Sequence, residues 1–333
     1  MIRTQNIDQI FHQQADIFEM TALDFFRHQA ANCPFYQKYI LALSKEINAV
    51  HTLTQIPFLP VSFFKSQKII TNELELHPDS TKLIFESSGT TGQVNSKHYV
   101  QDSVLYEKSF SACFETFYGS TEEYCVLGLL PSYLERSNSS LVYMVNYLIE
   151  KSKHPLSNFY LYNHDELYQN LQSLEAAKQK TILIGVTYAL LDFAEKYPID
   201  LCHTHIIETG GMKGRRVEML REEVHQVLKN NFKLAAIHAE YGMTELLSQA
   251  YSKGNGIFEC PPWMKVVVRD INDPFQISAN GKGVLNIIDL ANIHSCCFIA
   301  TDDIGEVFPD GIFTVAGRLD NSDLRGCSLM YET

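Results

Sequence analysis

The sequence predicts an α/β protein whose main sheet is largely parallel. From Lys82 onward, short apolar segments alternate with longer segments whose apolar residues recur at helical spacing. Parallel strands need a crossover connection, which is usually a helix, so this alternation is typical of an α/β fold. The expected strands lie at 82–86, 124–130, 180–186, 205–210, 233–242 and 264–270. The expected helices lie at 139–150, 165–179 and 215–230.

The two ends of the chain differ from this central region. Residues 1–80 carry apolar residues at helix-like spacing until the prolines of IPFLP interrupt the pattern. After Trp263 the helical segments stop, and apolar runs separated by turn signals predict a β-rich module. We therefore expect a helical segment at 1–80 packed on an α/β core at 81–270, followed by a β-rich module at 271–333 that ends in a tail.

Composition argues against several classes of protein. The net charge of −12 is unlike that of a general nucleic-acid binder, which shows a basic surface. No apolar run approaches the ~20 residues of a membrane-spanning helix, and the polar start MIRTQNIDQIFHQQ is unlike an export signal. The eight cysteines are scattered without the framework of a disulfide-rich domain, so we expect reduced thiols and a cytoplasmic protein.

The stretch FESSGTTGQVNSKHYV at residues 85–100 has the composition of a phosphate-binding loop. Glycines let backbone N–H groups approach an anion closely, and hydroxyl side chains add donors. Val94 stands where the common P-loop needs its second glycine, so the stretch is not that motif. An ordinary polar turn has the same composition, and both interpretations stay open at this point. His98 either lies near the phosphates or is an ordinary loop histidine. The residues of the candidate loop are Ser87, Ser88, Gly89, Thr90, Thr91 and Gly92.

Three further stretches combine glycine, carboxylate and hydroxyl residues: ETGGMKGR (208–215), AEYGMTE (239–245), and TDDIGEV with GRLD (301–320). Each is expected to follow the end of a strand, where open α/β sheets bind their ligands. Mg²⁺ prefers a few oxygen ligands together with phosphate oxygens, and a ribose diol donates to a carboxylate. The four stretches together therefore predict a site for a magnesium nucleotide.

The order SSGTTG, GG, YGMTE, TxD and GRxD resembles that of the adenylate-forming superfamily, which includes acyl-CoA synthetases, luciferases and peptide-synthetase adenylation domains. Within it, the stretches IPFLPVSFFK, LLPSYLERSNSSLVYM, ETGGMKG and the terminal RGC are most similar to LuxE-type acyl-protein synthetases. The resemblance covers nearly the whole chain from about Ile56. It implies the N-terminal domain fold of that superfamily, ATP and Mg²⁺ as ligands, and an acid-thiol ligase that acts on a fatty acid.

The resemblance also implies roles for matching residues around the phosphates. The loop from Ser87 to Gly92 would hold the β- and γ-phosphates of ATP. Thr244 would touch the α-phosphate, and Glu245 would bind Mg²⁺. Lys97 lies further from the loop than the corresponding lysine of most family members, so its part in nucleotide binding stays open.

The adenosine half of the nucleotide has its own implied contacts. Asp303 would accept the ribose hydroxyls, and Arg318 would reach the ribose or a phosphate. The implied platform for adenine consists of Gly210, Gly211, Tyr241 and Gly242.

The end of the chain departs from the superfamily pattern. The lysine expected in a GRxD…K stretch is missing, and Asp323 stands near its position. Members of the superfamily also carry a mobile C-terminal domain of roughly a hundred residues with a catalytic lysine. We expect that domain to be absent here.

Cys327 in RGCSLMYET matches the surroundings of the cysteine that accepts the acyl group in LuxE-type proteins. Its thiolate would be the nucleophile, and nearby Arg325 would favour that form. The acyl group would then pass to a partner such as an acyl reductase or an acyltransferase. Two alternatives stay open: the acceptor is coenzyme A or a carrier thiol, or the chain is a nucleotide-binding subunit without activity.

Overall fold

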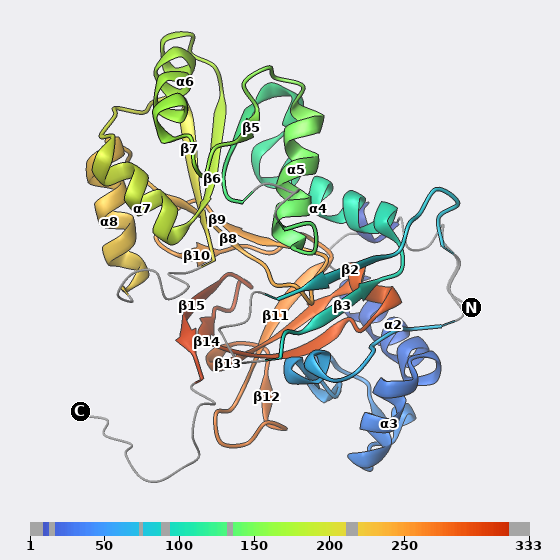
Figure 1. The fold of residues 1–333 in the computed structure, drawn as a ribbon. Coiled ribbons are helices and arrows are strands. Elements are labelled where there is room, and N and C mark those ends of the chain that lie inside the picture. The colour runs from blue at the N-terminus through green and yellow to red at the C-terminus, as the bar shows by residue number, and fades with distance from the viewer. Residues whose placement is uncertain are drawn as a thin grey trace, which may run out of the picture.

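The computed structural model describes residues 9–12, 17–72, 76–87, 94–131, 136–210 and 219–319. The chain is built around two large sheets, and the N-terminal helices pack beside the second of them (Figure 1). No helix in these ranges is long and apolar enough to cross a lipid bilayer.

The first sheet, here called the parallel sheet, has the strand order β5-β4-β6-β7-β8-β9. The strands from β5 to β8 pair in parallel, and β9 runs antiparallel to β8. The central strands β4 and β6 are buried along their whole length, as expected for strands covered on both faces. The strand bounds are β4 Cys125–Leu129, β5 Asn158–Phe159, β6 Thr181–Val186, β7 Thr204–Thr209, β8 His238–Tyr241 and β9 Ala250–Ser252.

Helices lie on both sides of the parallel sheet. In Figure 1, α4 and α5 lie to its right and α7 and α8 to its left. Asp102 caps α4 by accepting a hydrogen bond from the Leu105 N–H, and Ser139 caps α5 in the same way from Val142. The helix bounds are α4 Ser103–Tyr118, α5 Ser140–Ser152, α6 His164–Ala176, α7 Thr187–Lys196 and α8 Arg221–Phe232.

The second sheet, here called the C-terminal sheet, has the order β10-β15-β14-β13-β11-β12, and β1 pairs in parallel with the first part of β14. Its long strands β11, β13, β14 and β15 form an antiparallel meander. A separate hairpin joins β2 to β3. The bounds are β1 Leu59–Pro60, β2 Leu83–Glu86, β3 Lys97–Val100, β10 Ile257–Phe258, β11 Met264–Arg269, β12 Ile277–Ser278, β13 Gly281–Asp289, β14 Phe298–Val307 and β15 Phe313–Arg318.

The N-terminal helices α2 (Phe18–Asn32) and α3 (Pro34–Ala42) are fastened to the C-terminal sheet. The buried amide of Gln29 donates to the Ile293 carbonyl at 2.9 Å, and its oxygen accepts from the Cys297 N–H at 2.9 Å. The ring of Phe298 packs against Phe26 and Tyr36. Burial of these aromatic rings accounts for the attachment of a segment that makes little contact with the parallel sheet.

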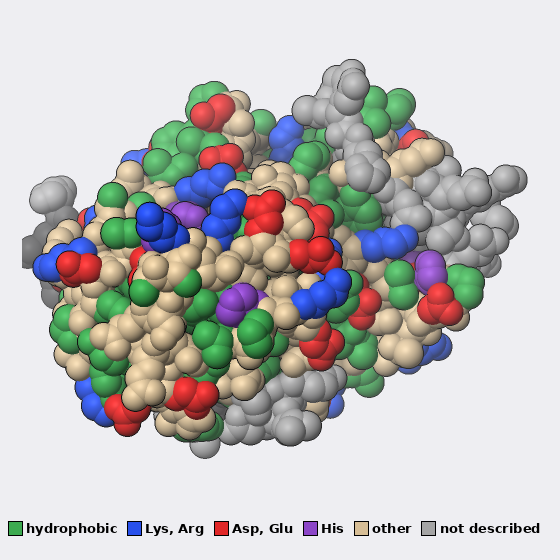
Figure 2. Space-filling model, turned by 90° about the horizontal axis from the view of Figure 1, so that it is seen from above, with side chains coloured by type: hydrophobic (Ala, Val, Ile, Leu, Met, Phe, Trp, Pro, Cys, Tyr) green, Lys and Arg blue, Asp and Glu red, His purple; other side chains and the backbone are tan. Residues whose placement is uncertain are grey.

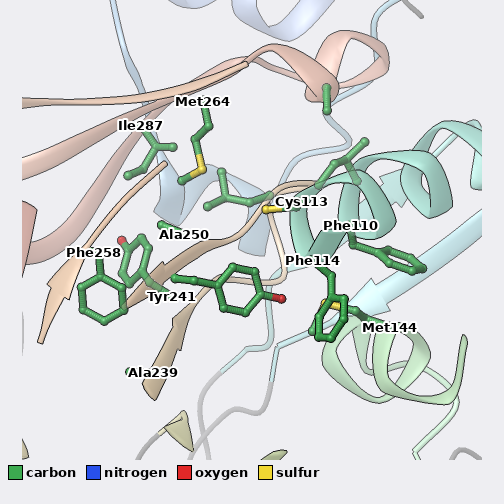
Figure 3. Close-up of a cluster of buried hydrophobic side chains, with 14 of the residues drawn as sticks. Phe110, Cys113, Phe114, Met144, Ala239, Tyr241, Ala250, Phe258, Met264 and Ile287 are labelled. Atoms are coloured by element: carbon green, nitrogen blue, oxygen red, sulfur yellow. The ribbon is translucent and has the colours of Figure 1, made fainter. Parts of the chain in front are cut away.

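One continuous hydrophobic core joins the two sheets. Figure 3 shows side chains from both of them packed between α4, β8 and the C-terminal sheet. Because the packing is continuous, residues on the two sheets keep fixed positions relative to one another. The labelled residues are Phe110, Cys113 and Phe114 on α4, Met144 on α5, Ala239, Tyr241 and Ala250 on β8 and β9, and Phe258, Met264 and Ile287 on the C-terminal sheet.

Most of the predicted elements are confirmed with shifted ends, and two predictions were incomplete. The strand predicted at 233–242 is limited to β8, because α8 extends to Phe232 and Lys233 follows it with a left-handed φ of 53°. The helix predicted at 215–230 is α8, and part of the predicted range lies outside the described residues. β3, α4 and α7 (Thr187–Lys196) were not predicted, and the strands predicted at 82–86 and 264–270 lie in the β2–β3 hairpin and the C-terminal sheet, outside the parallel sheet. Charged residues of both signs are interspersed on the face shown in Figure 2.

Candidate active site

Two neighbouring strands, β7 and β8, end side by side at the carboxyl edge of the parallel sheet. Gly210 follows β7 with a φ of 79°, a conformation that favours glycine. Gly242 follows β8, and a Cβ atom there would collide with the carboxylate of Glu240. Of these two predicted platform glycines, Gly210 is thus favoured by its backbone conformation, whereas at Gly242 the Glu240 carboxylate occupies the space of a side chain. Gly211, the third, lies outside the described residues.

A hydrogen-bonded cluster joins β8 to the C-terminal sheet at this edge. The Tyr241 hydroxyl donates to Asp303 Oδ2 at 2.7 Å, and Arg318 Nε donates to Asp303 Oδ1 at 2.8 Å. Tyr241 and Asp303 are buried, whereas 74% of the Arg318 side chain is exposed. Burial and the Asp303 charge raise the pKa of Tyr241 well above its usual value, so the phenol keeps its proton. The structure thus brings together three residues that the resemblance assigned to the nucleotide.

Asp303 reaches this position from within a strand. We expected the TDD stretch to follow a strand end, and this was wrong: it lies inside β14, opposite Arg318 on β15. Alternation along β14 turns Thr301 and Asp303 inward, and the pairing becomes irregular just beyond them, between Ile304 and Gly305. The site is therefore built from the end of β8 and the middle of β14.

Glu245 lies in the turn that follows β8, and only 4% of it is exposed. Burial raises its pKa, and a hydrogen bond with Ser96 and the charge of Arg318 act in the opposite direction. A cation close to Glu245 would stabilise the ionised carboxylate, because a nearby positive charge favours the ionised form of a buried acid. Thr244 precedes it and is only partly buried.

The glycine-rich stretch is described only at its two ends. Ser87 accepts a hydrogen bond from the Ser96 N–H at 2.9 Å, which closes the base of the stretch. Lys97 is on β3, where its ammonium lies 3.1 Å from the carboxylate of Glu86 on β2. Two groups of predicted residues lie outside the described residues, and their roles stay predictions: Ser88, Gly89, Thr90, Thr91 and Gly92 of the loop, and Cys327 of the tail.

Two buried polar residues at the site, Glu240 and Asn292, were not predicted from the sequence, and His98, which we expected either near the phosphates or in an ordinary loop, lies on the strand β3. Glu240 accepts a hydrogen bond from the Thr209 hydroxyl, and burial raises its pKa to about 7. His98 and Asn292 contact the turn that carries Glu245. Glu240 is in the stretch AIHAEY, His98 in KHYV and Asn292 in IIDLANIH. A polar residue among apolar neighbours was the sequence signal that could have indicated a buried polar role.

The residues present fit a magnesium nucleotide. Glu245 offers one hard oxygen ligand beside the Ser96 hydroxyl, which suits an ion whose other ligands are phosphate oxygens and water. Asp303 already accepts hydrogen bonds from a phenol and a guanidinium, so its oxygens are oriented for a third donor such as a ribose hydroxyl. Arg318 supplies an exposed positive charge next to them.

Solved structures with a similar fold are adenylate-forming enzymes. ATP-bound MatB from Rhodopseudomonas palustris superposes with a TM-score of 0.52 at 17% identity, over 71% of this chain and 47% of that one. The luciferase-like enzyme of the Zophobas morio mealworm superposes with a TM-score of 0.51 at 14% identity, over 83% of this chain and 61% of that one. The chain spans about half to three fifths of the length of these structures. They define the class of the fold, the N-terminal domain of adenylate-forming enzymes.

The sequence comparisons identify the family within this class. Residues 2–333 match the family model for the acyl-protein synthetase LuxE. A long-chain-fatty-acid–luciferin-component ligase of Aliivibrio fischeri is 24% identical over 96% of this chain and 89% of its own length. The Vibrio harveyi protein of the same name is 25% identical over 84% of this chain and 78% of its own length. The chain belongs to the LuxE family of acyl-protein synthetases, and it is a ligase.

Proposed function

We propose that this protein uses ATP to convert a fatty acid to its acyl-adenylate and then transfers the acyl group to Cys327. The use of ATP is supported by the cluster of Tyr241, Asp303 and Arg318 at the edge of the parallel sheet. Glu245 lies in the adjoining turn. Membership of the acyl-protein synthetase family supports the transfer of an acyl group to a protein. The names of the two bacterial relatives support a long-chain fatty acid as the substrate.

In the first step a carboxylate oxygen of the acid attacks the α-phosphorus of ATP. A phosphorus–oxygen bond forms, the bond to the β-phosphate oxygen breaks, and pyrophosphate leaves with the electron pair. Asp303 would hold the ribose, and Tyr241 would hold the adenine. Arg318 would offset the negative charge of the phosphates. Glu245 would hold Mg²⁺, which supplies positive charge to the phosphate oxygens when bound.

In the second step the Cys327 thiolate attacks the acyl carbonyl carbon of the mixed anhydride. The carbon–sulfur bond forms, the carbon–oxygen bond to the phosphate breaks, and AMP leaves. Burial raises the pKa of Cys113 and Cys260, which disfavours their thiolates as competing nucleophiles. The thioester would then be delivered to a partner protein that reduces or transfers acyl groups.

Two measurements test this proposal in sequence. Carboxylate-dependent exchange of pyrophosphate into ATP reports the first step, with saturated fatty acids of increasing length as substrates. Intact-protein mass after incubation with ATP and acid reports the second, and hydroxylamine should remove the added acyl mass. No exchange with any acid would contradict the first step.

Cys327→Ser should keep the exchange activity and lose the hydroxylamine-labile acyl mass, because a serine hydroxyl without a base has almost no alkoxide at neutral pH. Cys202→Ser is the matched control, because Cys202 is an exposed thiol with no proposed role and should be dispensable. Labile acyl mass on the Cys327→Ser protein would identify another cysteine as acceptor. Turnover that needs coenzyme A, with no acyl mass on the wild type, would favour the coenzyme A alternative.

A further inference from the structure

A buried histidine lies directly against the turn that carries Glu245. His98 is on β3, where alternation turns it inward, and only 1% of it is exposed. Its Nδ1 is 2.9 Å from the carbonyl oxygen of Thr244. A carbonyl oxygen only accepts hydrogen bonds, so Nδ1 carries a proton in this contact. On its other side the ring packs edge-on against Phe64, with ring centroids 5.8 Å apart.

Asn292 connects the same histidine to the next residue of the turn. His98 Nε2 lies 3.1 Å from Asn292 Oδ1, and Asn292 Nδ2 donates to the carbonyl oxygen of Glu245 at 2.7 Å. Asn292 is 1% exposed. Burial lowers the pKa of His98 to about 4, so the neutral ring has one proton, which it donates from Nδ1 to Thr244, and Nε2 contacts Asn292 without donating to it. Each residue of the pair thus donates to one carbonyl of the turn. Two consecutive carbonyls of the turn are therefore held by one buried pair of side chains.

The far end of the turn is held by a different group. Asp289 accepts hydrogen bonds from the N–H groups of Leu247 and Ser248 at 2.8 and 3.0 Å. The carbonyls at the near end are thus held from β3 and from the 3-10 helix Leu290–His294, and the amides at the far end are held from the last residue of β13. Between these two anchors the backbone has little freedom to rotate, and the direction of the Glu245 side chain depends on both.

We propose that His98 and Asn292 are a positioning pair that fixes the backbone of Thr244 and Glu245 and so directs the Glu245 carboxylate into the site. The pair acts through the turn. It is formed by residues 194 positions apart, and the turn lies between them in sequence. The catalytic consequence rests on the proposed role of Glu245, whereas the effect on the turn does not.

The first test measures amide hydrogen exchange of residues 242–248 by mass spectrometry in ligand-free protein. His98→Phe keeps an aromatic ring against Phe64 and removes both nitrogens. Asn292→Ala removes the other partner. We expect exchange in this segment to become at least about 10-fold faster in each variant, because each loses a buried hydrogen bond to a carbonyl of the turn. The control is His238→Phe, which changes a histidine at the opposite end of β8. In this variant residues 242–248 should exchange as in the wild type.

The second test measures pyrophosphate exchange with the same proteins. Outer partners of a metal ligand typically contribute about 10- to 100-fold to activity, and we expect a loss of kcat in that range with a rise in the Mg²⁺ concentration needed for half-maximal rate. The double variant should lose no more than the more severe single variant, because the pair acts as a unit. His98→Asn places an amide donor where Nδ1 was and should recover part of both readouts.

The outcomes separate the two proposals. Unchanged hydrogen exchange in folded His98→Phe and Asn292→Ala would overturn the positioning role, whether or not the wild type is active. Faster hydrogen exchange with unchanged kcat and Mg²⁺ dependence would overturn the catalytic consequence. If His98→Phe does not fold, hydrogen exchange of residues 242–248 in Asn292→Ala decides the question. An inactive wild type contradicts the proposed function and leaves the hydrogen-exchange result to decide the effect on the turn.

Discussion

Replacing Glu240 by glutamine should make the protein more stable at alkaline pH. The carboxyl is 8% exposed, it accepts a hydrogen bond from the Thr209 hydroxyl, and Glu208 adds a nearby negative charge. Burial and that charge raise its pKa from 4.5 to about 7. Glutamine can accept the same hydrogen bond from Thr209 without ionising, so the substitution isolates the cost of the buried charge.

The sign and size of the effect follow from proton linkage. Between pH 4.5 and about 7 the folded protein keeps the Glu240 proton, whereas the unfolded chain has released it. Stability therefore falls as pH rises through this window, by about 1.4 kcal/mol for each pH unit from this one group. The accumulated loss is about 3 kcal/mol above pH 7, and the glutamine variant should not show it.

The assay is urea unfolding at pH 5, 6, 7 and 8, followed by the fluorescence of Trp263, the single tryptophan, which is buried. The two proteins should be similar in free energy of unfolding near pH 5, and Glu240→Gln should be more stable by about 2–3 kcal/mol at pH 8. Glu222→Gln, on the exposed face of α8, controls for the loss of one negative charge. A difference between wild type and Glu240→Gln that stays constant from pH 5 to 8, or that grows toward low pH, would refute the reasoning.

Two other substitutions test the nucleotide site. Glu245→Ala should lower the rate of pyrophosphate exchange by ~10²–10³-fold, because the metal loses its protein carboxylate, and wild-type exchange in that variant would remove Glu245 from the mechanism. Asp303→Ala should raise the KM for ATP by about 10- to 100-fold, because it removes charge-assisted hydrogen bonds. Tyr241→Phe keeps the ring contacts and should raise that KM less, and equal effects of the two substitutions would contradict Asp303 as the ribose acceptor.

The fold class could be predicted because its signals are local. Strands such as β4 and β6 are continuous apolar runs, and α5 and α6 have helical periodicity, so each can be recognised from a few neighbouring residues. The ends of elements were predicted less well. β8 is shorter than its predicted run because the turn that follows α8 uses the first residues of that run.

The candidate site could be predicted in part because its motifs each contain the functional residue types. Tyr241, Asp303 and Arg318 were assigned to one ligand, and they meet in the structure. His98 and Asn292 could not be assigned, because nothing in KHYV or LANIH indicates that the two side chains meet at the turn between them in sequence.

The sequence by itself determined the alternation of strands and helices, the family, and the set of polar residues available for binding and catalysis. Only the tertiary structure decided which of these residues meet. Tyr241 and Asp303 are 62 residues apart, and His98 and Thr244 are 146 apart. Their contacts depend on how the two sheets and β3 pack around one continuous core. That packing results from the burial of many apolar side chains together, so no short stretch of the sequence contains it.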